Sequence, residues 1–168
     1  MYDLIILLGS MGAGKTTVAR ILKEKLDSPH IDYDWIRGFH LNKKWSNMND
    51  NERKMSLGNL VFILKNYIKH DYKNIIISGF RNYDLNKILQ EFTDNKVIIF
   101  TLVLTDDNIL KQRVLTESRD SGWRDYEESI KSNRKLRDNL KYPNEHKIDN
   151  TNQTPEETAN QIIELLSQ

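Results

Sequence analysis

The sequence predicts an α/β protein in which helices cover both faces of a five-stranded parallel sheet. Three segments rich in Ile and Val, residues 4–8, 75–77 and 97–104, have the length of strands and no alternation of polar and apolar residues. Strands without a polar face are typical of parallel sheets that are covered on both sides. Helical patterns separate these segments, and 168 residues are enough for one domain with a substantial core.

Two shorter strands complete the predicted sheet, at residues 30–32 and 146–148. Between the strands, apolar residues recur at helical spacing in three stretches: Val18, Leu22 and Leu26; Leu57, Leu60, Leu64 and Ile68; Ile109, Leu110 and Val114. Because strands and helices alternate along the chain, we expect right-handed crossovers between parallel strands.

Two of the predicted helices have recognisable ends. Pro29 stops the helix that contains Leu26, because proline cannot continue a helix. The last helix begins with Thr154 as its N-cap and Pro155 at its first position, and Glu157 completes a capping box. These signals place the end of the first predicted helix and the start of the last.

Charge and cysteine content narrow the classes of function. The chain has 25 basic and 24 acidic residues, and this balance disfavours nucleic acid or an anionic membrane as a partner. The absence of cysteine excludes disulfides, thiolate metal sites and a cysteine nucleophile, and it is typical of the reducing cytoplasm. The apolar residues 4–8 are too few for a signal or membrane helix. We expect a cytoplasmic protein, monomeric or homodimeric, that acts on a small molecule.

Residues 9–16, GSMGAGKT, match the phosphate-binding pattern G-x-x-x-x-G-K-[ST], the P-loop or Walker A motif. A predicted strand precedes it and a predicted helix follows, as the motif requires. The glycines let successive backbone N–H groups turn toward phosphate oxygens, and the helix directs its positive end to the same point. Lys15 would reach the β- and γ-phosphates, and the Thr16 hydroxyl would bind Mg²⁺. The alternative is a tight strand–helix turn with a solvated lysine.

The motif therefore predicts that ATP and Mg²⁺ are bound at this turn. The residues expected to hold the nucleotide there are Gly9, Met11, Gly12, Ala13, Gly14, Lys15, Thr16 and Thr17.

Two carboxylates follow the second predicted strand, in the segment HIDYDWIRG. Ligands of parallel sheets collect beyond the carboxyl ends of the strands. Asp32 and Asp34 could therefore serve the metal ion and an acceptor group, respectively. The alternative is a polar turn in which Asp34 caps a helix.

Arginines lie where an acceptor would be bound. The segment IIISGFRN ends the third strand, with Gly79 allowing close approach of a ligand and Arg81 at the rim. Arg37 and Arg53 belong to an excursion from the sheet, residues 35–72. Three guanidinium groups suit a phosphate or a carboxylate, so we expect an anionic acceptor.

A second excursion, residues 117–125, has the composition of a lid. Arg113, Arg119 and Arg124 surround a polar segment that contains Gly122. Arginines on a mobile flap can close over a phosphoryl group in transfer and neutralise its oxygens. The alternative is a pair of solvated basic helices.

These segments resemble those of the small P-loop kinases: the nucleoside monophosphate, shikimate and gluconate kinases. DYDWIRG is similar to the start of the acceptor-binding helix of nucleotide kinases, which implies roles for Asp34 and Arg37. It is equally similar to the aspartate pair of shikimate kinases, here Asp32 and Asp34, which serves magnesium and the acceptor hydroxyl. NDNERKM resembles a helix start that carries an acceptor-binding arginine, here Arg53.

The resemblance continues through the second half of the chain. SGFRN resembles the adenylate-kinase element DGFPR and implies that Arg81 binds the acceptor, although Ser78 replaces the aspartate. KQRVL is similar to a segment whose arginine stacks on adenine, here Arg113. SGWRDYEESIKSNR resembles a kinase lid with Arg124, and DNTNQTPEETANQII resembles the loop that borders the adenine, here with Asn150 and Thr151.

The resemblance implies a three-layer α/β/α P-loop NTPase fold in a single domain, residues 1–168. It implies a helical acceptor-binding insertion at residues 35–72 and a short lid at residues 117–125. It implies transfer of the γ-phosphoryl group from ATP·Mg²⁺ to a small anionic acceptor, nucleotide-like or hydroxy-acid-like. The glycine triplet of shikimate kinases is absent, which disfavours shikimate itself.

Together, the residues and the resemblance predict a role for each candidate. The expected catalytic residues are Lys15, Asp34, Arg119 and Arg124; the acceptor ligands are Asp34, Arg37, Arg53, Gly79 and Arg81; the metal ligands are Thr16 and Asp32; the adenine side is Arg113, Asn150 and Thr151. The alternatives are a phosphotransferase for nucleic-acid ends or antibiotics, and a regulatory module that binds ATP without catalysis, which the replacement at Ser78 favours.

Overall fold

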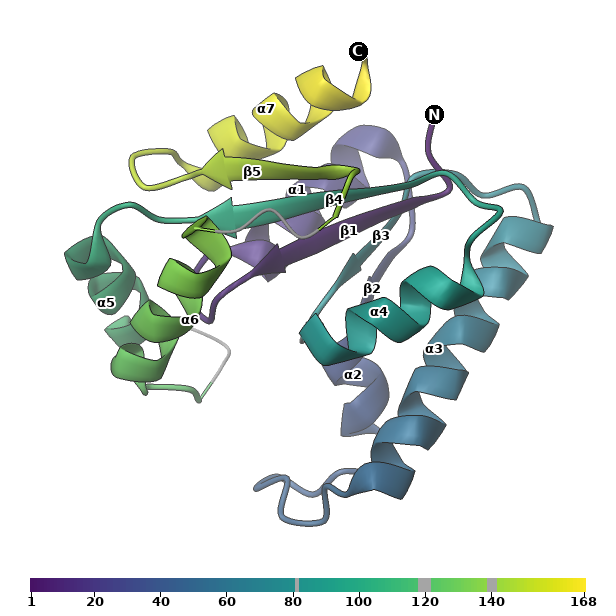
Figure 1. The fold of residues 1–168 in the computed structure, drawn as a ribbon, viewed down its shortest axis with the longest axis horizontal. Coiled ribbons are helices and arrows are strands. Elements are labelled where there is room, and N and C mark those ends of the chain that lie inside the picture. The colour runs from purple at the N-terminus through teal and green to yellow at the C-terminus, as the bar shows by residue number, and fades with distance from the viewer. Residues whose placement is uncertain (81, 118–121, 139–141) are drawn as a thin grey trace.

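The central sheet consists of five parallel strands in the order β2-β3-β1-β4-β5 (Figure 1). The computed structural model describes residues 1–80, 82–117, 122–138 and 142–168. Within them the strands are β1 Leu4–Gly9, β2 His30–Asp32, β3 Ile75–Ser78, β4 Val97–Val103 and β5 Glu145–Asp149. All five strands predicted from the sequence are confirmed, with ends that shift by one residue at most.

The helices that connect the strands are α1 Lys15–Leu26, α2 Tyr33–Gly38, α3 Asp50–Lys69, α4 Asn82–Glu91, α5 Asp107–Leu115 and α6 Tyr126–Asp138, and α7 Pro155–Leu166 follows β5. The capping box predicted at the start of α7 is present, with reciprocal hydrogen bonds between Thr154 and Glu157. Helix α4 was not predicted, although Leu85, Ile88 and Phe92 recur at helical spacing and are buried.

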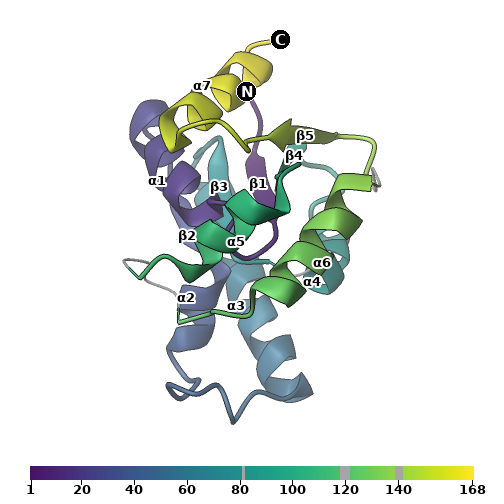
Figure 2. The same cartoon turned by 90° about the vertical axis from the view of Figure 1, so that its left-hand side faces the viewer.

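A separate hydrophobic core lies on each face of the sheet. Alternate strand residues, such as Leu4 and Ile6, pack against α2, α3 and α4 on one face. Their neighbours, such as Ile5 and Leu7, pack against α1, α5 and α7 on the other face. The two faces and their helices are visible in Figures 1 and 2. The predicted three-layer α/β/α fold class is therefore confirmed.

The parallel arrangement brings the carboxyl ends of all five strands to one edge of the sheet. Figure 2 looks toward this edge, around which α2, α5 and the start of α6 lie. The segments that carry the predicted chemistry follow β1, β2, β3 and β5 at this edge. The topology therefore gathers residues that are far apart in the sequence.

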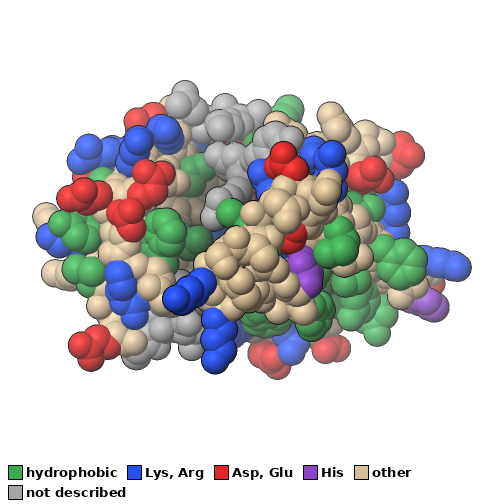
Figure 3. All heavy atoms as spheres, turned by 90° about the horizontal axis from the view of Figure 1, so that it is seen from below, with side chains coloured by type: hydrophobic (Ala, Val, Ile, Leu, Met, Phe, Trp, Pro, Cys, Tyr) green, Lys and Arg blue, Asp and Glu red, His purple; other side chains and the backbone are tan. Residues whose placement is uncertain are grey.

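The segment between β2 and β3 contains α2, a connecting loop and the 20-residue α3. Figure 3 views the molecule from the side of this segment, and its basic, acidic and hydrophobic side chains are interspersed. Several large apolar side chains here are exposed, with Phe39 at 86% and Phe62 at 73%. In the described ranges, no helix combines the length and the apolar character needed to span a membrane.

Candidate nucleotide and acceptor site

The P-loop connects β1 to α1 through three glycines that have positive φ angles: Gly9, Gly12 and Gly14. Helix α5 closely covers this loop, because a Cβ atom added to Gly12 would lie 2.7 Å from Val114 Cγ2. The Lys15 ammonium group donates hydrogen bonds to the carbonyl oxygens of Gly9 and Ser10, both at 2.9 Å. The lysine therefore lies folded back over the loop from which it extends.

The environment of the Ser10 hydroxyl shows whether the loop could accommodate a triphosphate. Its side chain is buried, at 3% exposure, and Oγ has no hydrogen-bond partner among the residues that the structure describes. A buried polar group without a partner costs about 1–3 kcal/mol, so such groups call for a ligand or water. A phosphate oxygen would accept from this hydroxyl, from Lys15 and from the amino end of α1. The residues of the loop therefore fit the phosphate groups of ATP.

The Asp32 carboxylate connects the P-loop helix with β2 and β3. Its Oδ2 accepts hydrogen bonds from Thr16 Oγ1 at 3.2 Å and from Ser78 Oγ at 3.0 Å, and its Oδ1 accepts from the Asp34 backbone N–H at 3.0 Å. Asp32 is thus the N-cap of α2, and the alternative in which Asp34 caps the helix is wrong. The structure places the two predicted metal ligands, Thr16 and Asp32, in contact.

Gly79 allows the Asp32 carboxylate to occupy this position. Its φ is 85°, which residues with a side chain rarely adopt, and an added Cβ would lie only 2.4 Å from Asp32 Oδ1. The neighbouring backbone of Tyr33 is also within 3.0 Å of that Cβ position. The close approach predicted for Gly79 is therefore made by a carboxylate of the chain itself.

Arg37 lies in α2 with its guanidinium group directed at a carboxylate of α3. Its Nε and Nη2 donate to Glu52 Oε1 and Oε2 at 3.1 and 2.8 Å, and both side chains are buried. These hydrogen bonds from Arg37 lower the pKa of Glu52 from its ordinary 4.5 to about 2. The pKa of Arg37 is raised by the same bonds to Glu52. A role for Arg37 in acceptor binding stays a prediction.

Aromatic and polar side chains complete the surroundings of this ion pair. His40 and Ser56 also contact Glu52 Oε1, at 3.0 and 3.2 Å. The Arg37 guanidinium carbon lies 4.8 Å from the centre of the Trp45 ring, within the range of a cation–π interaction. The insertion is therefore organised around a buried charged group.

The remaining predicted acceptor residues lie near the same segment. Asp34 is half-buried in the first turn of α2. Arg53 is partly buried, and its Nη2 lies 3.3 Å from Oδ1 of the buried Asp84 in α4. Arg81 falls outside the described residues. Asp34, Arg37 and Arg53 thus all lie in the segment between β2 and β3, where Arg37 is paired with Glu52 and Arg53 with Asp84.

The predicted adenine side forms a continuous hydrogen-bonded unit with the P-loop. Arg113 Nη2 donates to the carbonyl oxygens of Asn150 and Thr151 at 2.9 and 3.1 Å. The Asn150 side-chain amide donates in turn to the Ala13 carbonyl at 2.8 Å. Burial lowers the pKa of Arg113. The loop after β5 is therefore fixed against the phosphate-binding turn.

The segment predicted to be a lid connects α5 to α6, and residues 118–121, including Arg119, lie outside the described residues. Arg124 is exposed, and its Nη1 donates to the Trp123 carbonyl at 2.9 Å. The Trp123 indole N–H donates to Asp125 and Ser129 at the start of α6, and its ring packs on the core. Closure of this segment stays a prediction.

Sequence reasoning missed Glu52, which is bonded to Arg37, and His30, which contacts Ser78 beside Asp32. One signal for Glu52 was available, because Glu52, Ser56 and Leu60 recur every four residues and are all buried. A charged residue on a buried helical face requires a partner of opposite charge. For His30, the signal was its position two residues before Asp32, which puts both side chains on one face of β2.

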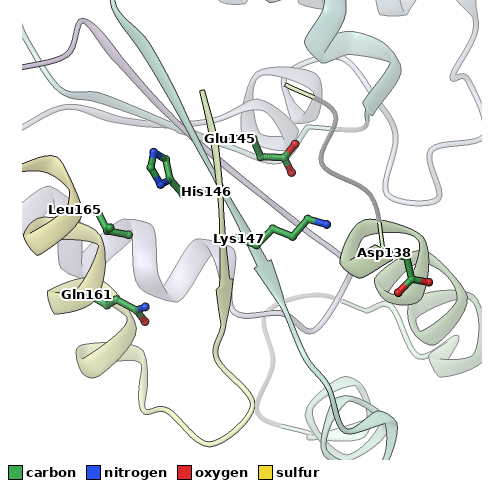
Figure 4. Close-up of a pocket in the computed structure, with 6 residues that line it drawn as sticks. All are labelled: Asp138, Glu145, His146, Lys147, Gln161 and Leu165. Atoms are coloured by element: carbon green, nitrogen blue, oxygen red, sulfur yellow. The ribbon is translucent and has the colours of Figure 1, made fainter. Parts of the chain in front are cut away.

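A hollow of about 580 Å³ lies elsewhere, beside the outer edge of β5 (Figure 4). It is lined by Asp138, Glu145, His146, Lys147, Gln161 and Leu165. His146 points toward α7, whereas Glu145 and Lys147 point to the side of α6. None of these residues was predicted to bind a ligand, and the hollow is lined by the first half of β5, away from the strand's carboxyl end.

Comparisons with known proteins bear on the family and the fold of this chain. Residues 5–134 match the protein family described as an AAA domain. A shikimate kinase of Enterococcus faecalis is 29% identical over 175 residues, which cover 98% of this chain and 98% of that protein. An adenylate kinase-like protein of Pyrococcus furiosus is 26% identical over 164 residues, which cover 98% of this chain and 84% of that protein.

Among solved structures, a sugar kinase of Janibacter has a TM-score of 0.71 at 15% identity, with 99% of this chain and 95% of that chain covered. At this identity the likeness concerns the fold. The residues matched by the family extend from β1 to α6 and include the P-loop, Asp32 and Asp34.

Proposed function

We propose that this chain, which belongs to the AAA domain family matched over residues 5–134, transfers the γ-phosphoryl group of ATP to a small acceptor. The predicted resemblance to the small P-loop kinases is confirmed, since the similar proteins include shikimate, adenylate kinase-like and sugar kinases. The observation that carries the proposal is that the P-loop, with Lys15 bonded to Gly9, and the Thr16–Asp32 contact lie at the same edge of the sheet.

The donor half of the site follows from the P-loop. Lys15 would exchange its two carbonyl partners for phosphate oxygens, and the Ser10 hydroxyl would gain the acceptor that it lacks among the described residues. Mg²⁺, held by Thr16 and Asp32, would neutralise negative charge on the phosphates. Arg119 and Arg124 would close over the phosphoryl group. Catalysis by these residues consists of positioning and charge stabilisation.

The acceptor half lies between α2, α3 and the end of β3. We assign it a small anionic acceptor, nucleotide-like or hydroxy-acid-like, contacted by Asp34, Arg37, Arg53, Gly79 and Arg81. Asp34 would orient an acceptor hydroxyl and take its proton; toward a phosphate acceptor it would only position the group. Arg53 would bind the anion in competition with Asp84, and Arg37 would contribute while it remains bonded to Glu52.

A cytoplasmic location, a monomeric or homodimeric state and the domain organisation are part of the same proposal. In that organisation one domain, residues 1–168, carries an acceptor-binding insertion at residues 35–72 and a lid at residues 117–125.

The test is an assay of ADP release with a panel of acceptors. Each anionic candidate is paired with its neutral counterpart: a nucleoside monophosphate with the nucleoside, and a hydroxy acid with its amide. We expect an anionic member to accelerate ADP release and the neutral member to do so much less. Equal rates within every pair would contradict an anionic acceptor.

Lys15→Ala is the matching test of the donor site. We expect turnover to be abolished while the circular dichroism spectrum is unchanged, because the Lys15 side chain is only half-buried and is not part of either hydrophobic core. Lys23→Ala, at an exposed position of α1, is the control and should keep full activity. Binding of ATP without consumption in the presence of every acceptor would favour the regulatory module instead.

A further inference from the structure

A chain of hydrogen bonds extends from the start of β2 to the P-loop helix. His30 Nε2 lies 2.9 Å from Ser78 Oγ, Ser78 Oγ lies 3.0 Å from Asp32 Oδ2, and the same Oδ2 lies 3.2 Å from Thr16 Oγ1. The sheet register explains this arrangement. Asp32 is paired with Ser78 across β2 and β3, and His30 shares the Asp32 face because side chains alternate along a strand.

The chemistry of these groups fixes the direction of each hydrogen bond. A carboxylate only accepts, so the single proton of the Ser78 hydroxyl is donated to Asp32. Ser78 can then only accept from His30, which requires the proton of the imidazole to be on Nε2. Thr16 likewise donates its proton to Asp32, which leaves the oxygen lone pairs of Thr16 available to a metal ion. The direction of donation therefore runs from His30 through Ser78 to Asp32.

Two further contacts hold the ends of this chain of hydrogen bonds in place. The Trp35 ring meets the His30 ring edge-on, with 5.5 Å between the ring centres, which restrains the plane of the imidazole. At the other end, the Asp34 backbone N–H donates to Asp32 Oδ1 at 3.0 Å, which restrains the oxygen opposite the one that contacts Ser78 and Thr16. Asp32 is 4% exposed, which makes each of these donors important to its energy.

We propose that His30 and Ser78 are positioning residues that hold the Asp32 carboxylate against the Thr16 hydroxyl and thereby prepare the metal site. This proposal rests on the proposed function, because His30 and Ser78 can prepare a metal site only if Thr16 and Asp32 hold the Mg²⁺ of ATP·Mg²⁺. Neither residue is assigned contact with the substrate. Their effect is to keep Asp32 in the orientation that the metal ion requires.

The main test is calorimetric titration of a non-hydrolysable ATP analogue in Mg²⁺ and, separately, in EDTA. We expect Mg²⁺ to tighten binding to the unaltered protein. In His30→Leu and Ser78→Ala this tightening should shrink about fivefold each, as expected for the loss of one ordinary hydrogen bond. The affinity in EDTA should not change, because Lys15 and the P-loop backbone are not altered.

Matched variants separate positioning from a general loss of structure. His30→Gln keeps a side-chain N–H donor of similar reach and should restore most of the Mg²⁺ effect, whereas His30→Leu should not. His146→Leu, at an exposed position of β5, should behave as the unaltered protein. A folding defect would weaken binding in EDTA as well, and the Gln variant would not correct it selectively.

The tautomer of His30 gives a readout that does not depend on ATP. Nitrogen-15 NMR of the imidazole should show the proton on Nε2 in the unaltered protein. A ring protonated only on Nδ1 would overturn the proposal, as would Mg²⁺ tightening that is unchanged in both His30→Leu and Ser78→Ala. If the unaltered protein binds the analogue in neither condition, the proposed function fails together with the positioning role. An unchanged Mg²⁺ effect in the variants leaves the proposed function in place.

Discussion

The Arg37 guanidinium and the Glu52 carboxylate form a bidentate ion pair that joins α2 to α3, with both side chains about 95% buried. Two parallel hydrogen bonds of this kind fix the angle between the groups as well as their separation. A partner left alone in such a site is an uncompensated buried charge, which is strongly unfavourable. The pair therefore fixes the position of α2 against the start of α3.

Glu52→Gln should destabilise the protein by about 3 kcal/mol, because Arg37 would keep its charge and lose its carboxylate. The measurement is the free energy of unfolding in urea. Asp50→Asn, an exposed acid in the same first turn of α3, is the control and should cost less than about 1 kcal/mol. Equal losses of unfolding free energy in the two variants would show that the buried ion pair stabilises the protein no more than an exposed acid does.

The low pKa of Glu52 predicts that the stability of the protein falls at acidic pH. Its pKa is about 2 in the folded protein, against an ordinary 4.5, so the unfolded chain binds more protons between these values. The stabilisation from Glu52 is therefore complete above about pH 4.5 and is lost as the pH falls toward 2. Unfolding free energies of the unaltered protein and of Glu52→Gln, measured from pH 6 to pH 2, should converge on acidification. A constant gap would contradict this.

Replacement by alanine should have opposite effects on stability at Gly79 and at Gly58. Gly79→Ala should destabilise the protein by more than about 1 kcal/mol, because its φ of 85° and the contact with Asp32 leave no room for a methyl group. Gly58→Ala should stabilise it by about 0.5–1 kcal/mol, because Gly58 lies inside α3 with nothing within 4 Å of an added Cβ. Thermal unfolding of both variants checks the prediction, and the same sign for both would refute it.

Asn150→Ala should weaken ATP binding about five- to tenfold. The substitution removes the hydrogen bond to the Ala13 carbonyl, so the loop after β5 would no longer be fixed to the P-loop. Asn152→Ala, at an exposed position of the same loop, serves as the control and should bind ATP as before. Fluorescence titration with a labelled ATP analogue measures both affinities, and no difference between the variants would count against the adenine-side assignment.

The fold was largely predictable because its signals are local. Apolar segments of strand length, the P-loop and the capping box at Thr154 each depend on residues close together in the sequence. The contact of Thr16 with Asp32 was also anticipated, because parallel topology brings the ends of β1 and β2 to one edge. Patterns of this kind require no knowledge of side-chain conformations.

The partners of the charged residues could not be predicted in the same way. Arg37 and Glu52 are 15 residues apart across a loop without a periodic pattern, and nothing in the sequence indicates that they meet. Arg53 and Asp84 belong to different helices on one face of the sheet, and their contact depends on how α3 and α4 pack. Such pairings are set by tertiary geometry, which the order of residue types does not contain.

The strand β5 lies at one margin of the sheet and carries Glu145, His146 and Lys147 in succession. An unpaired strand margin presents N–H and C=O groups to any other extended chain and is a common starting point of aggregation. A second molecule that added a strand here would have to dehydrate ionisable side chains on both sides of β5. We therefore expect these three residues, which help to line the hollow, also to disfavour edge-to-edge association when the protein is concentrated.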